Sequence, residues 1–231
     1  MIACDIDEVL FPYLSGYVKY YNRIHGTELQ VTDFHSYDFT KVHGGTREYI
    51  SDLVYAFHDE PEFEEIEPIT GALDAIHELQ DLGELHFVTA RQEAIANKTH
   101  NWIKKHFGID KHRIHIGNHW TRSSDTILHK RTKAEMCQAI RAEILIDDAP
   151  SYALECAESG MKVFLFDLHG AYGWNKPTPL HENITRVCSW DEAIKGIQDY
   201  ISIKHSRSSS MQSILEDKLR ELADRQISYP T

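Results

Sequence analysis

The sequence lacks several features that would assign it to other classes of protein. No apolar run reaches 18 residues, so we expect no transmembrane helix. Asp5 and Asp7 stand where a signal peptide would have a basic and then an apolar region. The four cysteines are far apart and form no C-x-x-C pair. We therefore expect a soluble, cytoplasmic protein with reduced, buried thiols.

Basic residues are also scarce relative to acidic ones. The chain has 24 Lys and Arg against 36 Asp and Glu, which gives a formal net charge of −12. This balance argues against binding to a nucleic-acid backbone or to an anionic membrane. It leaves room for a small phosphorylated substrate, because a metal ion can neutralise the charge of a phosphate locally.

The 231 residues alternate between short apolar strands and amphipathic helices. This rhythm predicts an α/β fold: a Rossmann-like parallel sheet of about five strands with helices on both faces. The expected strands cover residues 2–6, 85–89, 113–117, 143–147 and 162–166.

The rhythm is interrupted once, directly after the first strand. Residues 13–66 read as a small helical insertion, which leaves 1–12 and 67–202 as the α/β core. Residues 203–231 form a tail in which the polar run 206–210 is expected to separate a charged terminal helix from the core. That helix either packs or frays as a terminal element, or it joins two copies of the chain.

Chemistry-bearing side chains follow three of the expected strands. Asp5 and Asp7 follow the first, residues 89–91 (Thr-Ala-Arg) follow the second, and Asp147 and Asp148 follow the fourth. The carboxyl ends of parallel strands open on one crevice, so we expect these groups to converge there. Several carboxylates in one place repel one another unless a divalent cation is present. Ligands that are all oxygen favour Mg²⁺.

A hydroxyl and a lysine beside metal-bound carboxylates are typical of phosphoryl transfer. The loop and helix before the fourth strand offer Lys130 and Lys133. Lys133 is favoured because it opens the helix that leads directly into that strand.

Further residues are candidates for substrate contacts. Ala90 and Arg91 follow the second strand, and Asn118 and Trp120 follow the third. In the insertion, aromatic and basic side chains either contact the substrate or pack the insertion internally; the foremost candidates are Tyr37 and Phe39.

Taken together, these motifs resemble a known family. Asp5-Ile6-Asp7, Thr89, Lys133 and Asp147-Asp148 are similar, in order and setting, to the four motifs of haloacid dehalogenase-like (HAD) phosphatases. The insertion after the first motif resembles the helical C1 cap of that superfamily. The Asp-Asp-Ala-Pro run, the cap size and the residues around Trp174 and Trp190 resemble the 5′(3′)-deoxyribonucleotidase branch. The resemblance covers residues 1–202.

The resemblance implies a Mg²⁺-dependent phosphomonoesterase with assigned residue roles. Asp5 would be the nucleophile that forms an aspartyl-phosphate, and Asp7 the general acid and base. Thr89 and Lys133 would hold the phosphoryl oxygens. The implied Mg²⁺ ligands are Asp5, the backbone carbonyl of Asp7, and Asp147 or Asp148. The substrate would be a small phosphorylated metabolite such as a 5′(3′)-(deoxy)nucleotide.

One residue departs from the family pattern, and two other functions stay open. Glu8 stands where members often have glycine, so its carboxylate either faces away or weakens phosphate binding. The Thr-Ala-Arg run at 89–91 also resembles polynucleotide 3′-end phosphatases, although the net charge of −12 argues against them. Glu8 and the tail leave a non-catalytic HAD-fold scaffold as the other alternative.

Overall fold

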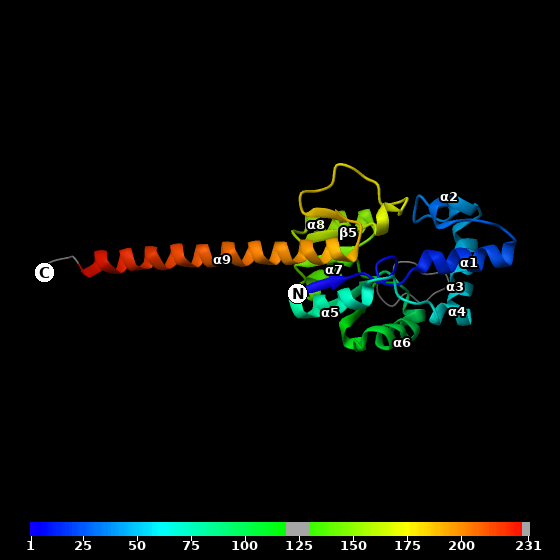
Figure 1. The fold of residues 1–231 in the computed structure, drawn as a ribbon, viewed down its shortest axis with the longest axis horizontal. Coiled ribbons are helices and arrows are strands. Elements are labelled where there is room, and N and C mark those ends of the chain that lie inside the picture. The colour runs from blue at the N-terminus through cyan, green and yellow to red at the C-terminus, as the bar shows by residue number, and fades with distance from the viewer. Residues whose placement is uncertain (119–129, 228–231) are drawn as a thin grey trace. The chain divides into compact units, whose positions relative to one another are not determined.

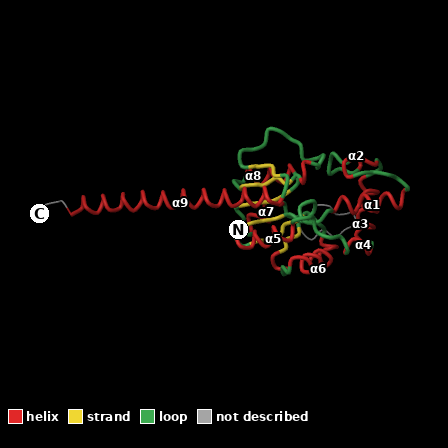
Figure 2. Tube along the Cα trace, viewed as in Figure 1, coloured by secondary structure: helices red, strands yellow, loops and turns green. Residues whose placement is uncertain are grey.

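The structure is a computed structural model that describes residues 1–118 and 130–227. It divides into two compact units, Met1–Ile194 and Lys195–Thr231 (Figure 1). The first unit contains every described strand and all the shorter helices, whereas the described part of the second is a single helix (Figure 2).

The first unit is built on a six-stranded parallel sheet with the order β3-β2-β1-β4-β5-β6. This confirms the predicted fold class. The strands are β1 (Ile2–Cys4), β2 (Leu85–Thr89), β3 (Ile114–Ile116), β4 (Ile144–Asp147), β5 (Lys162–Phe166) and β6 (Ile184–Val187).

The sixth strand, β6, is one more than the sequence predicted. Its sequence Ile-Thr-Arg-Val offers only two apolar residues, and both middle residues are polar. An edge strand needs fewer apolar residues than a central one because only one neighbour covers it. The Thr185 hydroxyl accepts a hydrogen bond from Lys162 Nζ on β5 at 2.7 Å, so a polar pair supports this edge.

Helices cover both faces of the sheet. Ala3, Val88 and Leu145 belong to a core cluster shared with α7 (Lys133–Ala139) and α8 (Pro150–Glu158). On the opposite face, the ring of Phe87 packs on Phe107 of α6, and Phe166 packs on Trp190 at the start of α9. The helices of this face are α5 (Ala72–Leu82), α6 (Ala96–Phe107) and the first turn of α9, a helix that spans Trp190–Ile227. Short 3₁₀ turns lie at η2 (Glu93–Ile95), η3 (Lys111–Arg113) and η4 (Leu168–Gly170).

The segment between β1 and α5 is helical. It contains α1 (Tyr13–His25), η1 (Val31–Asp33), α2 (Thr40–His43), α3 (Arg47–Asp59) and α4 (Pro61–Glu64). The two connecting segments that join it to the core meet where the Ile69 N–H donates to the Leu10 carbonyl at 2.8 Å.

Helix α6 fastens the insertion to the core. The Trp102 indole N–H donates to the Ile66 carbonyl at 2.6 Å, and Lys98 Nζ donates to the His58 carbonyl at 2.6 Å. Both donors lie on α6 and both acceptors lie at the end of the insertion, so the insertion is held against this helix.

The polar run 206–210 does not interrupt α9, contrary to the sequence-based expectation. Serine hydroxyls can bond to the carbonyl one helical turn earlier and so remain within a helix. Ser206, Ser209 and Ser210 make such bonds, to the carbonyls of Ser202, His205 and Ser206. Within the described residues, no helix is both long and apolar enough to cross a bilayer.

Candidate active site

The site begins where β1 ends. The register pairs Cys4 of β1 with Ile146 of β4, so the residues that follow, Asp5 and Asp147, emerge side by side. The Asp5 N–H donates to the Ile146 carbonyl at 2.9 Å, which extends this pairing by one residue. The Asp5 side chain is turned back on its own loop, because its Oδ1 accepts the Ile6 N–H at 2.7 Å.

Three buried carboxylates gather at this point. Asp5, Asp147 and Asp148 each place one oxygen within 4.8 Å of the other two. Burial, together with the charge of Asp147, raises the pKa of Asp5 from 3.8 to about 7, although Lys133 opposes the rise. Burial and the charges of Asp147 and Asp5 likewise raise the pKa of Asp148. Burial and mutual repulsion thus disfavour the ionised forms of these carboxylates.

Lys133 is the cation that the structure places in this cluster. Its Nζ lies 2.5 Å from Asp5 Oδ2 and 2.5 Å from Asp147 Oδ2, and its side chain is fully buried. Burial alone would lower the pKa of Lys133, but the two carboxylates outweigh burial and raise it. Lys130, the other candidate, is exposed.

The local fold explains why Lys133 reaches the carboxylates. It is the first residue of α7, and the capping box between Thr132 and Glu135 fixes where that helix begins. The Thr132 hydroxyl accepts the Glu135 N–H at 3.1 Å, and the Glu135 carboxylate accepts the Thr132 N–H at 2.8 Å. The lysine is thus held at the carboxyl end of β4, where it contacts Asp147.

The residues that follow β2 have different positions. Thr89 is fully buried, and its hydroxyl accepts the Arg91 N–H at 3.2 Å. Ala90 and Arg91 line the cavity described below. The Arg91 guanidinium is directed at Asp7, with Nη2 lying 2.7 Å from Asp7 Oδ1.

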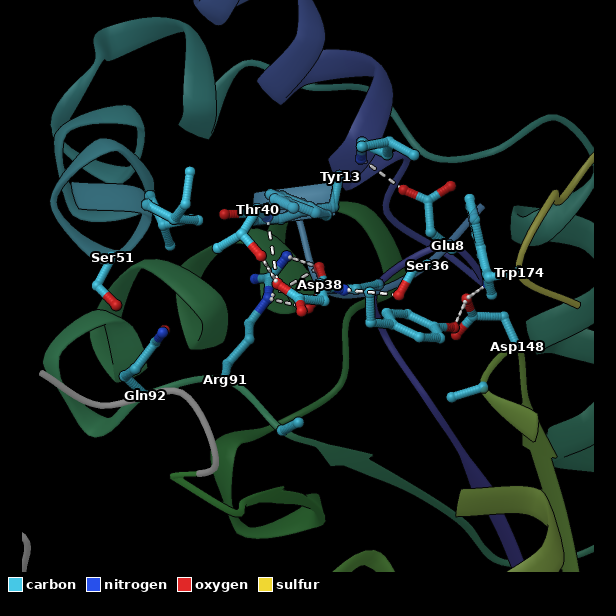
Figure 3. A pocket seen from close by; sticks show the side chains of 18 of the residues that line it. Glu8, Tyr13, Ser36, Asp38, Thr40, Ser51, Arg91, Gln92, Asp148 and Trp174 are labelled. Atoms are coloured by element: carbon cyan, nitrogen blue, oxygen red, sulfur yellow. Dashed lines mark hydrogen bonds and ion pairs between the residues drawn. The ribbon is translucent and has the colours of Figure 1, made fainter. Parts of the chain in front are cut away.

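A cavity of about 620 Å³ opens between the strand ends and the helical insertion (Figure 3). Asp5, Asp7 and Asp148 line its core side. The insertion contributes aromatic and polar side chains, which include Tyr13, Phe39, Thr40, Arg47, Ser51 and Tyr55. Of the described cluster residues, Lys133 and Asp147 are not among those that line this cavity; both are fully buried, and Lys133 contacts Asp5, which does line it.

Tyr37 and Phe39 both reach this cavity, but they differ in their contacts. The Tyr37 hydroxyl donates to Asp148 Oδ2, which ties the insertion to the acidic cluster. Phe39 packs against Tyr17 and Phe34, with ring centroids 4.9 and 5.1 Å apart. Phe39 therefore combines a packing role in the insertion with a face on the cavity.

Asn118 follows β3 and is not among the residues that line this cavity. It is buried, and its side-chain oxygen accepts the Glu93 N–H at 2.5 Å, which joins the loop after β3 to η2. It does not line the cavity, so its described contact is structural. Trp120, the other candidate after β3, lies outside the described residues.

The structure adds Trp174 and Glu8 to the site. The Trp174 indole N–H donates to Asp148 Oδ2 at 2.9 Å, from the loop between β5 and β6 (Figure 3). Glu8 is buried, and its Oε1 accepts the Leu14 N–H at 2.5 Å in the first turn of α1. Local periodicity does not indicate these contacts, because Trp174 is 26 residues from Asp148 and the Glu8 side chain bonds to a backbone N–H six residues further on.

Glu8, which stands where family members often have glycine, adopts a backbone conformation typical of glycine. Its φ of 57° lies in the left-handed region that glycine adopts easily, so a non-glycine residue is strained there. The Tyr172 hydroxyl donates to the Glu8 carbonyl at 2.7 Å and holds this conformation. Burial and the charge of Asp7 raise the pKa of Glu8 from 4.5 to about 8.

Comparison with known proteins identifies the family. Residues 1–204 match the family model described as 5′ nucleotidase, deoxy (pyrimidine), cytosolic type C protein (NT5C). The chain belongs to the NT5C family. The expected membership in the HAD-like superfamily is thereby confirmed.

One curated protein is similar in sequence to part of the chain. A curated nucleotidase from Clostridium acetobutylicum is 31% identical over 125 residues, which are 54% of this chain and 55% of that protein. The chain thus spans about half the length of this curated relative.

Solved structures share the fold. A predicted phosphatase from Clostridium acetobutylicum superposes with a TM-score of 0.57 at 17% identity, covering 86% of this chain and 97% of that one. A HAD family hydrolase from Deinococcus radiodurans, solved with bound phosphate and sodium, has a TM-score of 0.56 at 12% identity and covers 83% and 92%.

Proposed function

We propose that this NT5C member is a Mg²⁺-dependent phosphomonoester hydrolase that acts through an aspartyl-phosphate on Asp5. The observation that carries the proposal is the buried cluster of Asp5, Asp147 and Asp148. Asp5 and Asp147 share the Lys133 ammonium, and Asp5 and Asp148 line a cavity. A carboxylate attacks a phosphate dianion only where positive charge offsets their repulsion. Lys133 supplies part of that charge.

The reaction has two steps. An Asp5 carboxylate oxygen bonds to phosphorus while the bond from phosphorus to the leaving oxygen breaks, and Asp7 gives its proton to that oxygen. A water molecule then attacks the phosphorus of the aspartyl-phosphate and gives a proton to Asp7, which frees Asp5 and phosphate. Asp7 suits both transfers because its side chain is 30% exposed and lines the cavity, whereas Asp5 is buried. Lys133 and Thr89 would hold the phosphoryl oxygens.

A divalent cation fits the acidic cluster. The three carboxylates are buried together, and burial and their mutual repulsion raise the pKa of Asp5 and of Asp148, so a bound cation would stabilise their ionised forms. Asp5, Asp148 or Asp147, and the Asp7 carbonyl would hold the ion. Bound Mg²⁺ would neutralise charge on the phosphoryl group.

We propose a nucleoside monophosphate as the substrate. The cavity volume of about 620 Å³ lies within the range of small-molecule sites. Phe39 and Tyr55 offer ring faces to a base, and Thr40, Ser51 and Arg47 offer polar groups to a sugar or base edge. The name of the relative from Clostridium acetobutylicum, a nucleotidase, supports this substrate class. The family description includes the word cytosolic, which supports the cytoplasm as the site of action.

The test is hydrolysis by Asp5→Asn, which keeps the size of the side chain and removes the nucleophilic charge. We expect release of p-nitrophenol from p-nitrophenyl phosphate to fall by several orders of magnitude. Asp74→Asn is the matched control, because Asp74 is exposed on α5 outside the cavity. Wild-type activity in Asp5→Asn would refute the mechanism.

A substrate screen separates the proposed function from its alternatives. It compares nucleoside monophosphates, sugar phosphates and 3′-phosphorylated oligonucleotides with and without Mg²⁺. Preference for an oligonucleotide would favour a polynucleotide 3′-end phosphatase. No hydrolysis of any substrate would favour a non-catalytic protein.

A further inference from the structure

Arg91 borders the cavity, but its guanidinium is paired with the carboxylate of Asp7. Its Nη2 lies 2.7 Å from Asp7 Oδ1, and its Nε lies 3.1 Å from Oδ2 and 3.2 Å from Oδ1. This forked contact fixes the plane of the carboxylate as well as its position. The Arg91 side chain is 3% exposed and the Asp7 side chain is 30% exposed, so the aspartate faces the cavity and the arginine supports it.

Three elements hold the guanidinium in place. Its Nη1 donates to the buried Thr99 hydroxyl on α6 at 3.1 Å. Its central carbon lies 4.4 Å from the ring centroid of Phe11 and 5.5 Å from that of Phe63, on the loop after β1 and on α4 respectively. A guanidinium held by a hydroxyl and two aromatic rings has little freedom to turn away from Asp7 and contact a bound substrate.

We propose that Arg91 is a positioning residue, which orients Asp7 for proton transfer to the leaving oxygen, and that it is not a ligand of the substrate phosphate. The inference rests on the proposed function. It revises the sequence-based expectation that Arg91 binds substrate. A carboxyl group that delivers a proton must be aimed at the acceptor oxygen within hydrogen-bond reach, and the contact with Arg91 supplies this aim.

This role predicts a dependence on the leaving group. A weakly basic p-nitrophenolate departs without a proton, whereas a strongly basic alkoxide must be protonated as it leaves. Loss of a well-aimed acid therefore slows substrates with basic leaving groups most. A residue that binds the phosphate contacts the part common to all substrates, so its loss slows them equally.

The experiment compares p-nitrophenyl, phenyl and benzyl phosphate, which are similar in size but rise in leaving-group basicity. Arg91→Met keeps an apolar stem against Phe11 and Phe63. We expect its kcat/KM to fall at least about 10-fold more for benzyl than for p-nitrophenyl phosphate. General acid catalysis contributes a rate factor of about 10²–10⁴, so a loss of this size is within reach. Arg91→Lys retains the charge without the fork and should restore part of the loss.

Three further variants control for folding, for the role of Asp7 and for the loss of an arginine elsewhere. Thr99→Val removes one acceptor from Arg91 and leaves the ion pair, so it should show the same pattern with a smaller amplitude even if Arg91→Met folds poorly. In Asp7→Asn, the added Arg91→Met change should cause no further loss on benzyl phosphate, because the two residues act through one proton transfer. Arg23→Met removes an exposed arginine paired with Glu60 and should leave all three substrates unchanged.

The outcomes are distinguishable. Equal slowing of all three substrates by Arg91→Met, with weaker inhibition by inorganic phosphate, would overturn the inference and make Arg91 a phosphate ligand. Faster turnover in Arg91→Met would also overturn it, because Arg91 would then hold Asp7 away from the leaving group. If the wild type hydrolyses none of the three in Mg²⁺, the proposed function itself fails.

Discussion

Replacing Glu8 by glutamine should stabilise the protein at neutral pH. Glu8 is buried with its Oε1 on the Leu14 N–H, and glutamine can offer the same oxygen to the same donor. What the substitution removes is the carboxylic acid group, whose pKa is raised from 4.5 to about 8, first by burial and then by the charge of Asp7. Glu8→Gln therefore removes the titration and keeps the hydrogen bond.

The size of the effect follows from proton linkage. A group whose pKa is raised by folding contributes stability below its unfolded pKa, and this contribution is lost as the pH rises towards the folded pKa. For Glu8 the loss begins near pH 4.5 and is complete above about pH 8. At pH 7 it spans about 2.5 pH units at 1.36 kcal/mol each, or about 3 kcal/mol.

Urea unfolding of both proteins in EDTA at pH 5, 6, 7 and 8 measures this difference. Asp5 and Asp148 titrate in both proteins, so their contributions cancel to a first approximation in the comparison. The free energies of unfolding should nearly coincide at pH 5 and diverge as the pH rises, with the variant the more stable. Parallel curves would refute the reasoning, since they would mean that Glu8 has the same pKa in the folded and unfolded states.

Three further changes test the site. EDTA should abolish hydrolysis and Mg²⁺ should restore it, while Ca²⁺ should support it poorly because calcium prefers more ligands at longer distances; full activity in EDTA would exclude the proposed metal site. Lys133→Met leaves Asp5 and Asp147 without their shared cation and should lower the free energy of unfolding by about 3–5 kcal/mol, measured in urea at pH 7. An unchanged urea midpoint would contradict the view that Lys133 stabilises the buried carboxylates of Asp5 and Asp147. Phe39→Ala should change the relative kcat/KM among nucleotides more than it changes p-nitrophenyl phosphate hydrolysis, since stacking on a base contributes about 1–3 kcal/mol. Equal slowing of every substrate would show that Phe39 serves only to pack the insertion.

The sequence by itself determined the fold class and the identity of the acidic cluster. Alternation of apolar strands with amphipathic helices is a local pattern, so it can be read without coordinates. The parallel arrangement then brings the ends of β1 and β4 together, and with them Asp5 and Asp147. The helical nature of residues 13–66 followed from the same periodicity. The sequence missed β6, because an edge strand with two polar residues has little apolar pattern to detect.

Only the tertiary structure decided which side chains meet. Lys133 and Lys130 are both lysines near one helix start, and the buried contacts of Lys133 with Asp5 and Asp147 separate them. Arg91 is 84 residues from Asp7 in the chain, and Trp174 is 26 residues from Asp148. Such contacts depend on where loops pass one another after the sheet has formed, and no local periodicity encodes that. Charge balance and the direction of each side chain are therefore properties of the assembled site, because burial and long-range neighbours set them.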